Sequence, residues 1–198
     1  MQRTPVAVLG TLAEFHREPI PYDMAALVEL VASIRPDLLC LDMTPEQWRQ
    51  RDFGGLPPEY REALLPLARQ TDIVVVPVGG DRPPPEPSAS GWRGWAIDQL
   101  RRGLAWLQRG APDARAVNEG PRHLLADGLY GLIARLAVGN VQMAWREHNI
   151  RLVDRILEVV ERDPGRRVLV VVNARHCHHV RRALAARAEV RQVRFADL

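Results

Sequence analysis

Residues 166–184 read RRVLVVVNARHCHHVRRAL and contain the clearest indication of architecture in this chain. An unbroken run of five apolar residues, VLVVV from Val168, ends at Asn173 and is followed by three histidines at positions 176, 178 and 179. A β-branched run without polar alternation is typical of a strand covered on both faces, as in a parallel sheet between helices. We expect a helix to begin near His179. The pattern predicts imidazole side chains at the carboxyl end of a buried strand.

Three more apolar runs resemble this strand: VAVLG from Val6, LLCLDM from Leu38 and IVVVPV from Ile73. The run VRQVRF from Val190 alternates instead, which predicts an edge strand that could also pair two copies into a homodimer. Helical patterns cover residues 23–34, 57–70, 94–109, 124–138, 141–162 and 179–188. The order predicts a single α/β domain, residues 1–198, with a mostly parallel sheet flanked by helices and a helical insertion (about 94–162) before the last parallel strand.

The composition excludes several classes of protein. The net charge is +3 and every basic residue is arginine, but the arginines are interleaved with acids, so no nucleic-acid surface is expected. Cys40 and Cys177 form no disulfide framework, which favours a reducing compartment. The apolar run near the N-terminus is too short for a signal peptide or membrane span, so we expect a cytoplasmic protein without a membrane partner. Trp92, Trp95 and Trp106 are expected to pack in the core.

Polar residues follow each predicted parallel strand, where ligands bind in open α/β sheets. Glu14 and His16 follow the first strand, Asp42 ends the second, Arg82 follows the third, and His176 follows the fourth. Imidazoles and carboxylates from separate loops can form a divalent metal site or an acid–base pair. Ordinary structural roles stay open for each: His176 as a surface or capping residue, Asp42 as a turn former, and Glu14 with His16 in a surface ion cluster.

The pattern from residue 141 to 162 places Asn149 on the apolar stripe of a helix, in line with Trp145, Leu152 and Ile156. A buried amide needs hydrogen-bond partners, because leaving it unpaired costs a few kcal/mol. Asn149 is therefore expected either to face a polar cleft or to hold a backbone loop. Glu147 lies beside the stripe.

Two blocks resemble a known family. VAVLGTLAEFH with LVASIRPDLLCLDMTPEQW, and REHNIRLVDRILEVVERDPGRRVLVVVNARHCHHVRRAL, are similar to the opening and closing blocks of the TraB, GumN and TIKI group, within a superfamily that includes erythromycin-esterase-like and ChaN-like haem-binding proteins. The blocks cover roughly the first quarter and the last third of the chain. The resemblance implies an α/β fold with a site at the strand ends.

The family motifs map onto particular residues. The second motif histidine falls on His176, the acidic residue on Asp42, and the helix pair on His148 and Asn149. Gly10 and Thr11 match the first motif, but Ala13 stands where its histidine belongs. In the TIKI branch two histidines and the acid serve a divalent-metal peptidase site. His16 could replace the missing ligand; otherwise the fold holds a different ligand or none.

The first functional expectation is therefore a metal-dependent hydrolase acting on a peptide or ester bond. His16, Asp42 and His176 would hold a divalent transition metal that lowers the pKa of bound water. The remaining expected site residues are Glu14, Glu147 and Asn149 as catalytic groups and Arg82, Arg175 and His178 as contacts to a small-molecule or peptide substrate. The alternatives are a non-catalytic module that binds a ligand or haem, and metal-free acid–base chemistry by Glu14, His16 and Asp42.

Overall fold

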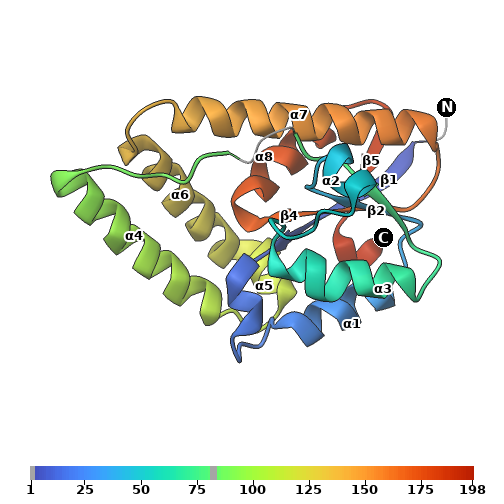
Figure 1. Ribbon diagram of the computed structural model, residues 1–198, viewed down its shortest axis with the longest axis horizontal. Helices are drawn as coiled ribbons and strands as arrows, with labels where there is room; N and C mark the ends of the chain where they lie inside the picture. The colour runs from blue at the N-terminus through green and yellow to red at the C-terminus, as the bar shows by residue number, and fades with distance from the viewer. Residues whose placement is uncertain (1–2, 81–83) are drawn as a thin grey trace.

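The computed structural model describes residues 3–80 and 84–198, and within them five strands form one parallel sheet in the order β3-β2-β4-β1-β5 (Figure 1). The strands are β1 (Thr4–Thr11), β2 (Leu38–Leu41), β3 (Val74–Pro77), β4 (Val168–Asn173) and β5 (Val190–Gln192). β4 lies between β1 and β2, with Val170 in register with Val8 and Cys40. The predicted α/β class is confirmed, and the expected edge strand β5 is parallel as well.

Helices cover both faces of the sheet. On one face, α1 (Met24–Ile34), the short π-helix η2 (Tyr60–Leu64) and α3 (Leu65–Arg69) pack on alternate strand residues such as Leu9, Leu39 and Leu169. On the other face, α7 (Val141–Arg162) and α8 (Ala174–Ala185) pack on Val8, Cys40 and Val170. The central strands β2, β4 and β1 are apolar at consecutive positions because both of their faces are buried.

The remaining helices lie beyond the carboxyl ends of the strands (Figure 1). The helices α4 (Gly91–Arg109), α5 (Ala114–Asn118) and α6 (Gly120–Leu136) precede α7, so the expected helical insertion is present between β3 and β4. A separate apolar cluster that includes Ile97, Leu104 and Ile133 joins α4 to α6. Short segments complete the chain: the 3-10 helices η1 (Ala13–Arg17) and η3 (Phe195–Asp197), and α2 (Pro45–Gln50).

A buried amide fastens the insertion to the sheet. The Asn118 side chain accepts a hydrogen bond from the Gly10 amide (2.6 Å) and donates one to the Gly10 carbonyl (3.1 Å), so it pairs with β1 as a neighbouring strand would. Position 10 has no room for a side chain, because a Cβ atom there would lie 2.7 Å from the Cys177 sulfur. The insertion is thereby held at the strand ends.

Two expectations about local structure are wrong. Helix α8 begins at Ala174, not near His179, because the Asn173 side chain accepts a hydrogen bond from the Arg175 amide and caps the helix directly after β4. The tryptophans of α4 are exposed: Trp92, Trp95 and Trp106 lie on the opposite side of the helix from its buried residues. No helix in the described part of the chain is long and apolar enough to cross a membrane.

Candidate active site

A carboxylate and a buried imidazole meet at the carboxyl end of β2. Asp42 follows the strand, and its Oδ2 atom lies 2.8 Å from Nε2 of His148, which α7 supplies from the helical insertion. The His148 side chain is only 2% exposed, whereas that of Asp42 is 20% exposed. Gly79 passes so close to Asp42 that a Cβ atom would lie 2.8 Å from the other carboxylate oxygen. Asp42 is thus the accessible member of the pair.

The second ring nitrogen of His148 is unusual. Among the residues that the structure describes, its Nδ1 atom is buried and has no hydrogen-bond partner. A buried polar atom without a partner carries a cost of about 1–3 kcal/mol, which proteins retain most often where function uses the atom. Nδ1 is therefore a free acceptor or donor site within the candidate centre.

A second pair lies beside the first. Nδ1 of His176 lies 2.9 Å from the Asn149 side-chain oxygen, and Nε2 accepts a hydrogen bond from the Arg175 guanidinium (3.1 Å). The amide oxygen requires a proton on Nδ1, and the guanidinium requires a bare Nε2, so the imidazole is neutral. Burial, Arg175 and His148 hold the pKa of His176 well below its usual range.

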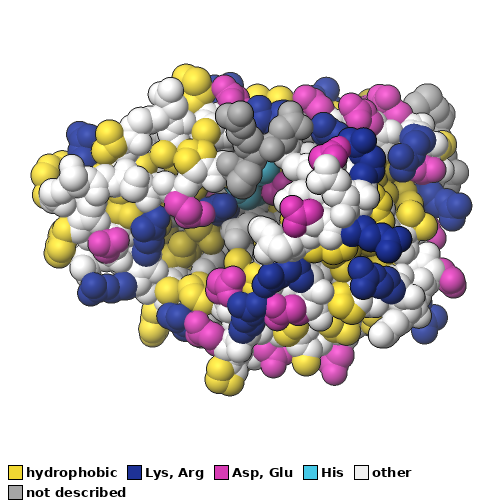
Figure 2. Space-filling view, in the orientation of Figure 1, with side chains coloured by type: hydrophobic (Ala, Val, Ile, Leu, Met, Phe, Trp, Pro, Cys, Tyr) yellow, Lys and Arg dark blue, Asp and Glu magenta, His cyan; other side chains and the backbone are white. Residues whose placement is uncertain are grey.

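The two pairs form one unit, which we call the polar cluster: Asp42, His148, Asn149, Arg175 and His176. The ring centroids of His148 and His176 are 4.9 Å apart. A cavity of about 630 Å³ is lined by Asp42, His148, Arg175 and His176 from the cluster. Histidine side chains are visible at the bottom of a hollow on this face of the molecule (Figure 2). The cluster therefore combines an acid–base pair with a fixed cation beside an open cavity.

His16 is placed differently from its expected role as a metal ligand. Its Nε2 accepts a hydrogen bond from the Leu12 amide (2.9 Å), and its Nδ1 lies 2.9 Å from the Tyr22 carbonyl. Both ring nitrogens are therefore occupied by backbone groups, and burial lowers the pKa of His16 to about 4. His16 holds the turn after β1. Ala13, the position of the missing motif histidine, lines the cavity instead.

The other expected site residues divide into two groups. Glu14 lines the rim of the cavity but is exposed and pairs with Arg17 (2.8 Å). Glu147 is exposed and lies 3.9 Å from Arg151, and His178 faces Asp127 of α6 at 3.9 Å. Arg82 lies outside the described residues. The structure thus brings Asp42, Asn149, Arg175 and His176 together, but it separates Glu147 and His178 from them.

Sequence reasoning missed two residues of the site, and also a buried carboxylate whose neighbours Pro58 and Tyr60 line the cavity. His148 was considered only as one half of a helix pair, because its position beside the apolar stripe gives no sign of burial against Asp42. Glu86 lies in a proline-rich segment without periodicity. Glu59 is buried next to the end of β1; burial raises the pKa of its carboxyl group, and a hydrogen bond from Thr11 opposes that effect.

The donor set does not fit a three-ligand metal site. Within residues 3–80 and 84–198, no group of three or more His, Cys, Asp and Glu side chains is arranged to hold a metal ion. Both ring nitrogens of His176 are hydrogen-bonded, one of them to the Arg175 cation, so neither offers a free lone pair to a metal ion. Asp42 and the free Nδ1 atom lie on different sides of the His148 ring, so the two cannot converge on one ion.

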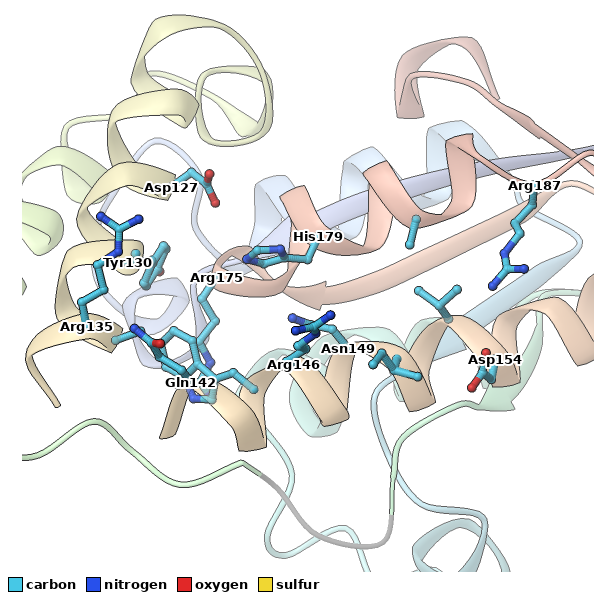
Figure 3. A pocket seen from close by; sticks show the side chains of 16 residues that line it. Asp127, Tyr130, Arg135, Gln142, Arg146, Asn149, Asp154, Arg175, His179 and Arg187 are labelled. Atoms are coloured by element: carbon cyan, nitrogen blue, oxygen red, sulfur yellow. The ribbon is translucent and has the colours of Figure 1, made fainter. Parts of the chain in front are cut away.

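Two further cavities adjoin the polar cluster and share Arg175 with it. One, of about 830 Å³, lies between η1, α4 and α6 and includes Ala13 and Trp145 in its lining. The other, of about 610 Å³, lies between α6, α7 and α8; Asn149 and Arg175 point toward it beside Tyr130 and His179 (Figure 3). Cavities of this size are typical of small-molecule sites.

The chain was compared with protein-family models, with curated proteins and with solved structures, and none of them matches it significantly. The resemblance to the TraB, GumN and TIKI group stays a prediction.

Proposed function

We propose that the protein is a metal-independent hydrolase of ester or peptide bonds, in which the Asp42–His148 pair activates water. The observation that carries the proposal is the 2.8 Å contact between an accessible carboxylate and a buried imidazole whose other nitrogen is unpaired in the described structure. A carboxylate and an imidazole within hydrogen-bond reach form a common general acid–base arrangement. The fold-level resemblance to esterase-like proteins is in accord with this class, as an analogy only.

The proposed chemistry follows from the difference in exposure between the two side chains: Asp42 is accessible from the cavity, and His148 is buried. A water molecule in the cavity gives a proton to Asp42 while its oxygen bonds to the carbonyl carbon of the substrate, and the π electron pair moves onto the carbonyl oxygen until the carbonyl re-forms and the leaving group departs. Nε2–H of His148 donates a hydrogen bond to the Asp42 carboxylate, which stabilises its charge and fixes its orientation toward the cavity. When the bond to the leaving group breaks, the pair returns that proton to the departing oxygen or nitrogen.

The second pair supports this step by position. Asn149 and Arg175 fix the neutral ring of His176 against His148, which keeps a second positive charge away from the reacting pair. Arg175 also lines the cavity. The part of its guanidinium that does not contact His176 would bind an anionic group of a peptide or small-molecule substrate. Asn149 and His176 are thus positioning residues, and Asp42 is the catalytic residue.

The test is hydrolysis of a panel of p-nitrophenyl esters and fluorogenic peptides, with and without an acidic side chain. Asp42→Asn and His148→Gln should each lower kcat/KM by about 100-fold or more, as loss of a general base does. Asp52→Asn is the matched control, because this exposed carboxylate lines the same cavity without contacting His148. Activity of Asp42→Asn equal to that of the wild type would refute the proposal.

Chelation separates this mechanism from the metal-dependent one expected from the sequence. We predict that exhaustive dialysis against EDTA leaves kcat/KM unchanged within about twofold. Loss of activity on dialysis with recovery on adding Zn²⁺ would contradict the assignment and restore the metal hydrolase. Metal content of the purified protein, measured by mass spectrometry, gives an independent readout.

A second candidate function is a non-catalytic ligand-binding module. The observation that favours it is that Arg175 lines three cavities, of about 630, 830 and 610 Å³, each of a size that could hold a small molecule. A protein with no hydrolysis of any panel member, but with saturable ligand binding that Arg175→Gln abolishes, would support this alternative.

A further inference from the structure

One ion pair lies in the lining shared by two of the cavities beside the polar cluster. Nη1 of Arg175 lies 2.7 Å from Oε1 of Glu86, and Arg101 of α4 approaches the other carboxylate oxygen at 3.9 Å. Glu86 lines both the 630 Å³ and the 830 Å³ cavities, as Arg175 does. A carboxylate of the chain itself therefore occupies the position at which these cavities meet.

Arg175 is fixed by contacts that do not involve Glu86. Its Nε donates to His176 (3.1 Å), its guanidinium lies 5.4 Å from the Trp145 ring centroid, and its backbone amide is bound by the cap residue Asn173. The side chain is only 19% exposed. An arginine held in this way presents a preorganised group to an anion, because little conformational entropy remains to be lost on binding.

Glu86 is the less constrained partner. Its side chain is 70% exposed, and it belongs to an irregular segment, PPEP from Pro84 to Pro87. This segment is anchored through its backbone: Trp145 donates to the Pro85 carbonyl (3.2 Å) and Arg101 to the Pro87 carbonyl (2.6 Å). The backbone can therefore stay in place while the Glu86 side chain turns out to solvent.

We propose that Arg175 and Arg101 form the subsite for a carboxylate group of the ligand, and that Glu86 fills this subsite from within the chain. An incoming carboxylate displaces the exposed glutamate while the rigid arginine stays fixed. The subsite lies beside His176 and thus beside the Asp42–His148 pair. As a statement about substrates this inference rests on the proposed hydrolase function: the favoured substrates carry a carboxylate, as acidic peptides and half-esters of dicarboxylic acids do.

The test is calorimetric titration of glutarate, a dicarboxylate similar to the glutamate side chain, at constant ionic strength. Glu86→Gln should bind glutarate about fivefold more tightly than the wild type, because a partly exposed ion pair changes an equilibrium constant by up to about this factor. Glu46→Gln is the matched control: Glu46 lines the same cavity and pairs with Arg49, and its removal should leave glutarate affinity unchanged. Equal affinities of Glu86→Gln and the wild type would refute the subsite.

Two further variants locate the effect. In the Glu86→Gln background, Arg175→Gln should abolish the gain in affinity; a gain that persists would place the anion elsewhere and overturn the assignment. Arg101 lies on the exposed side of α4. In the same background, Arg101→Gln should reduce the gain in glutarate affinity. This variant tests the same subsite if Arg175→Gln does not fold. A gain that Arg101→Gln leaves at full size removes Arg101 from the subsite.

Comparing the glutarate titrations with the hydrolysis assay separates the two proposals. Tight binding of glutarate in Glu86→Gln without hydrolysis of any panel member by the wild type retains the subsite and refutes the hydrolase. Hydrolysis that depends on Asp42, combined with no effect of Glu86→Gln on glutarate, retains the hydrolase and refutes the subsite.

Discussion

Acid should destabilise the protein through His16, and the size of the effect follows from the structure. The buried ring accepts a hydrogen bond from the Leu12 amide and donates one to the Tyr22 carbonyl, which only a neutral imidazole can do. Burial lowers the pKa of this histidine from its ordinary value of 6.5 to about 4. The unfolded chain therefore binds a proton at a higher pH than the folded chain.

The sign and the pH range follow from linkage. Because the unfolded state binds more protons, the free energy of unfolding falls as the pH drops below about 6.5, and the loss is complete near pH 4. The difference between 6.5 and about 4 corresponds to a total of about 3 kcal/mol, of which about 2 kcal/mol is lost between pH 7 and pH 5. His176 acts in the same direction, because its pKa is lowered too.

The assay is urea unfolding followed by circular dichroism at pH 7 and at pH 5. His16→Gln removes the titrating group, so it should be less stable than the wild type at pH 7 by about 1–2 kcal/mol through weaker backbone hydrogen bonds, and the difference should vanish near pH 5. The exposed His179→Gln is the control, and it should follow the wild type at both values. If the wild type and His16→Gln lose stability in parallel, His16 is not the buried neutral residue described above.

Four shorter predictions concern packing and the site. Gly10→Ala should destabilise by about 1–3 kcal/mol, because its Cβ would meet the Cys177 sulfur, whereas Gly128→Ala, with no atom within 4 Å of its Cβ on α6, should stabilise by about 0.5–1 kcal/mol. Asn149→Leu should cost about 1–3 kcal/mol, because it leaves the buried N–H of His176 unpaired. Urea midpoints measure these three changes, and unchanged midpoints for Gly10→Ala or Asn149→Leu would contradict the packing described. Thermal midpoints should stay within about 2 °C after dialysis against EDTA, and a larger fall would indicate a structural metal.

The class of fold could be predicted because its signal is local. Runs such as VLVVVN at Val168 are apolar at consecutive positions, and this pattern occurs where both faces of a strand are covered. The helical insertion was equally clear from the absence of strand patterns between residues 94 and 162. The start of α8 was placed too late, because a cap by Asn173 is a side-chain hydrogen bond that periodicity does not register. The outward direction of Trp92 was missed because the apolar side of α4 packs mainly on α6, and no described element covers the side of the helix that carries the tryptophans.

The candidate site was predicted only in part. The strand-end rule places Asp42 and His176 at one edge of the sheet, and the apolar stripe brings Asn149 to the same place. The rule does not distinguish an imidazole that faces the cavity from one that is turned toward the backbone. His16 belongs to the second kind, and nothing in residues 12–16 indicates that the Leu12 amide and the Tyr22 carbonyl would occupy both of its nitrogens.

The sequence by itself determined that this chain forms a parallel α/β sheet with polar residues at its carboxyl edge, because buried strands and their ends can be recognised from consecutive residues. Only the tertiary structure decided which of those residues meet. Asp42 and His148 are 106 positions apart, and Glu86 and Arg175 are 89 apart. Such contacts depend on how α7 and the 84–87 segment pack over the sheet, which is a property of the whole fold and of no local pattern.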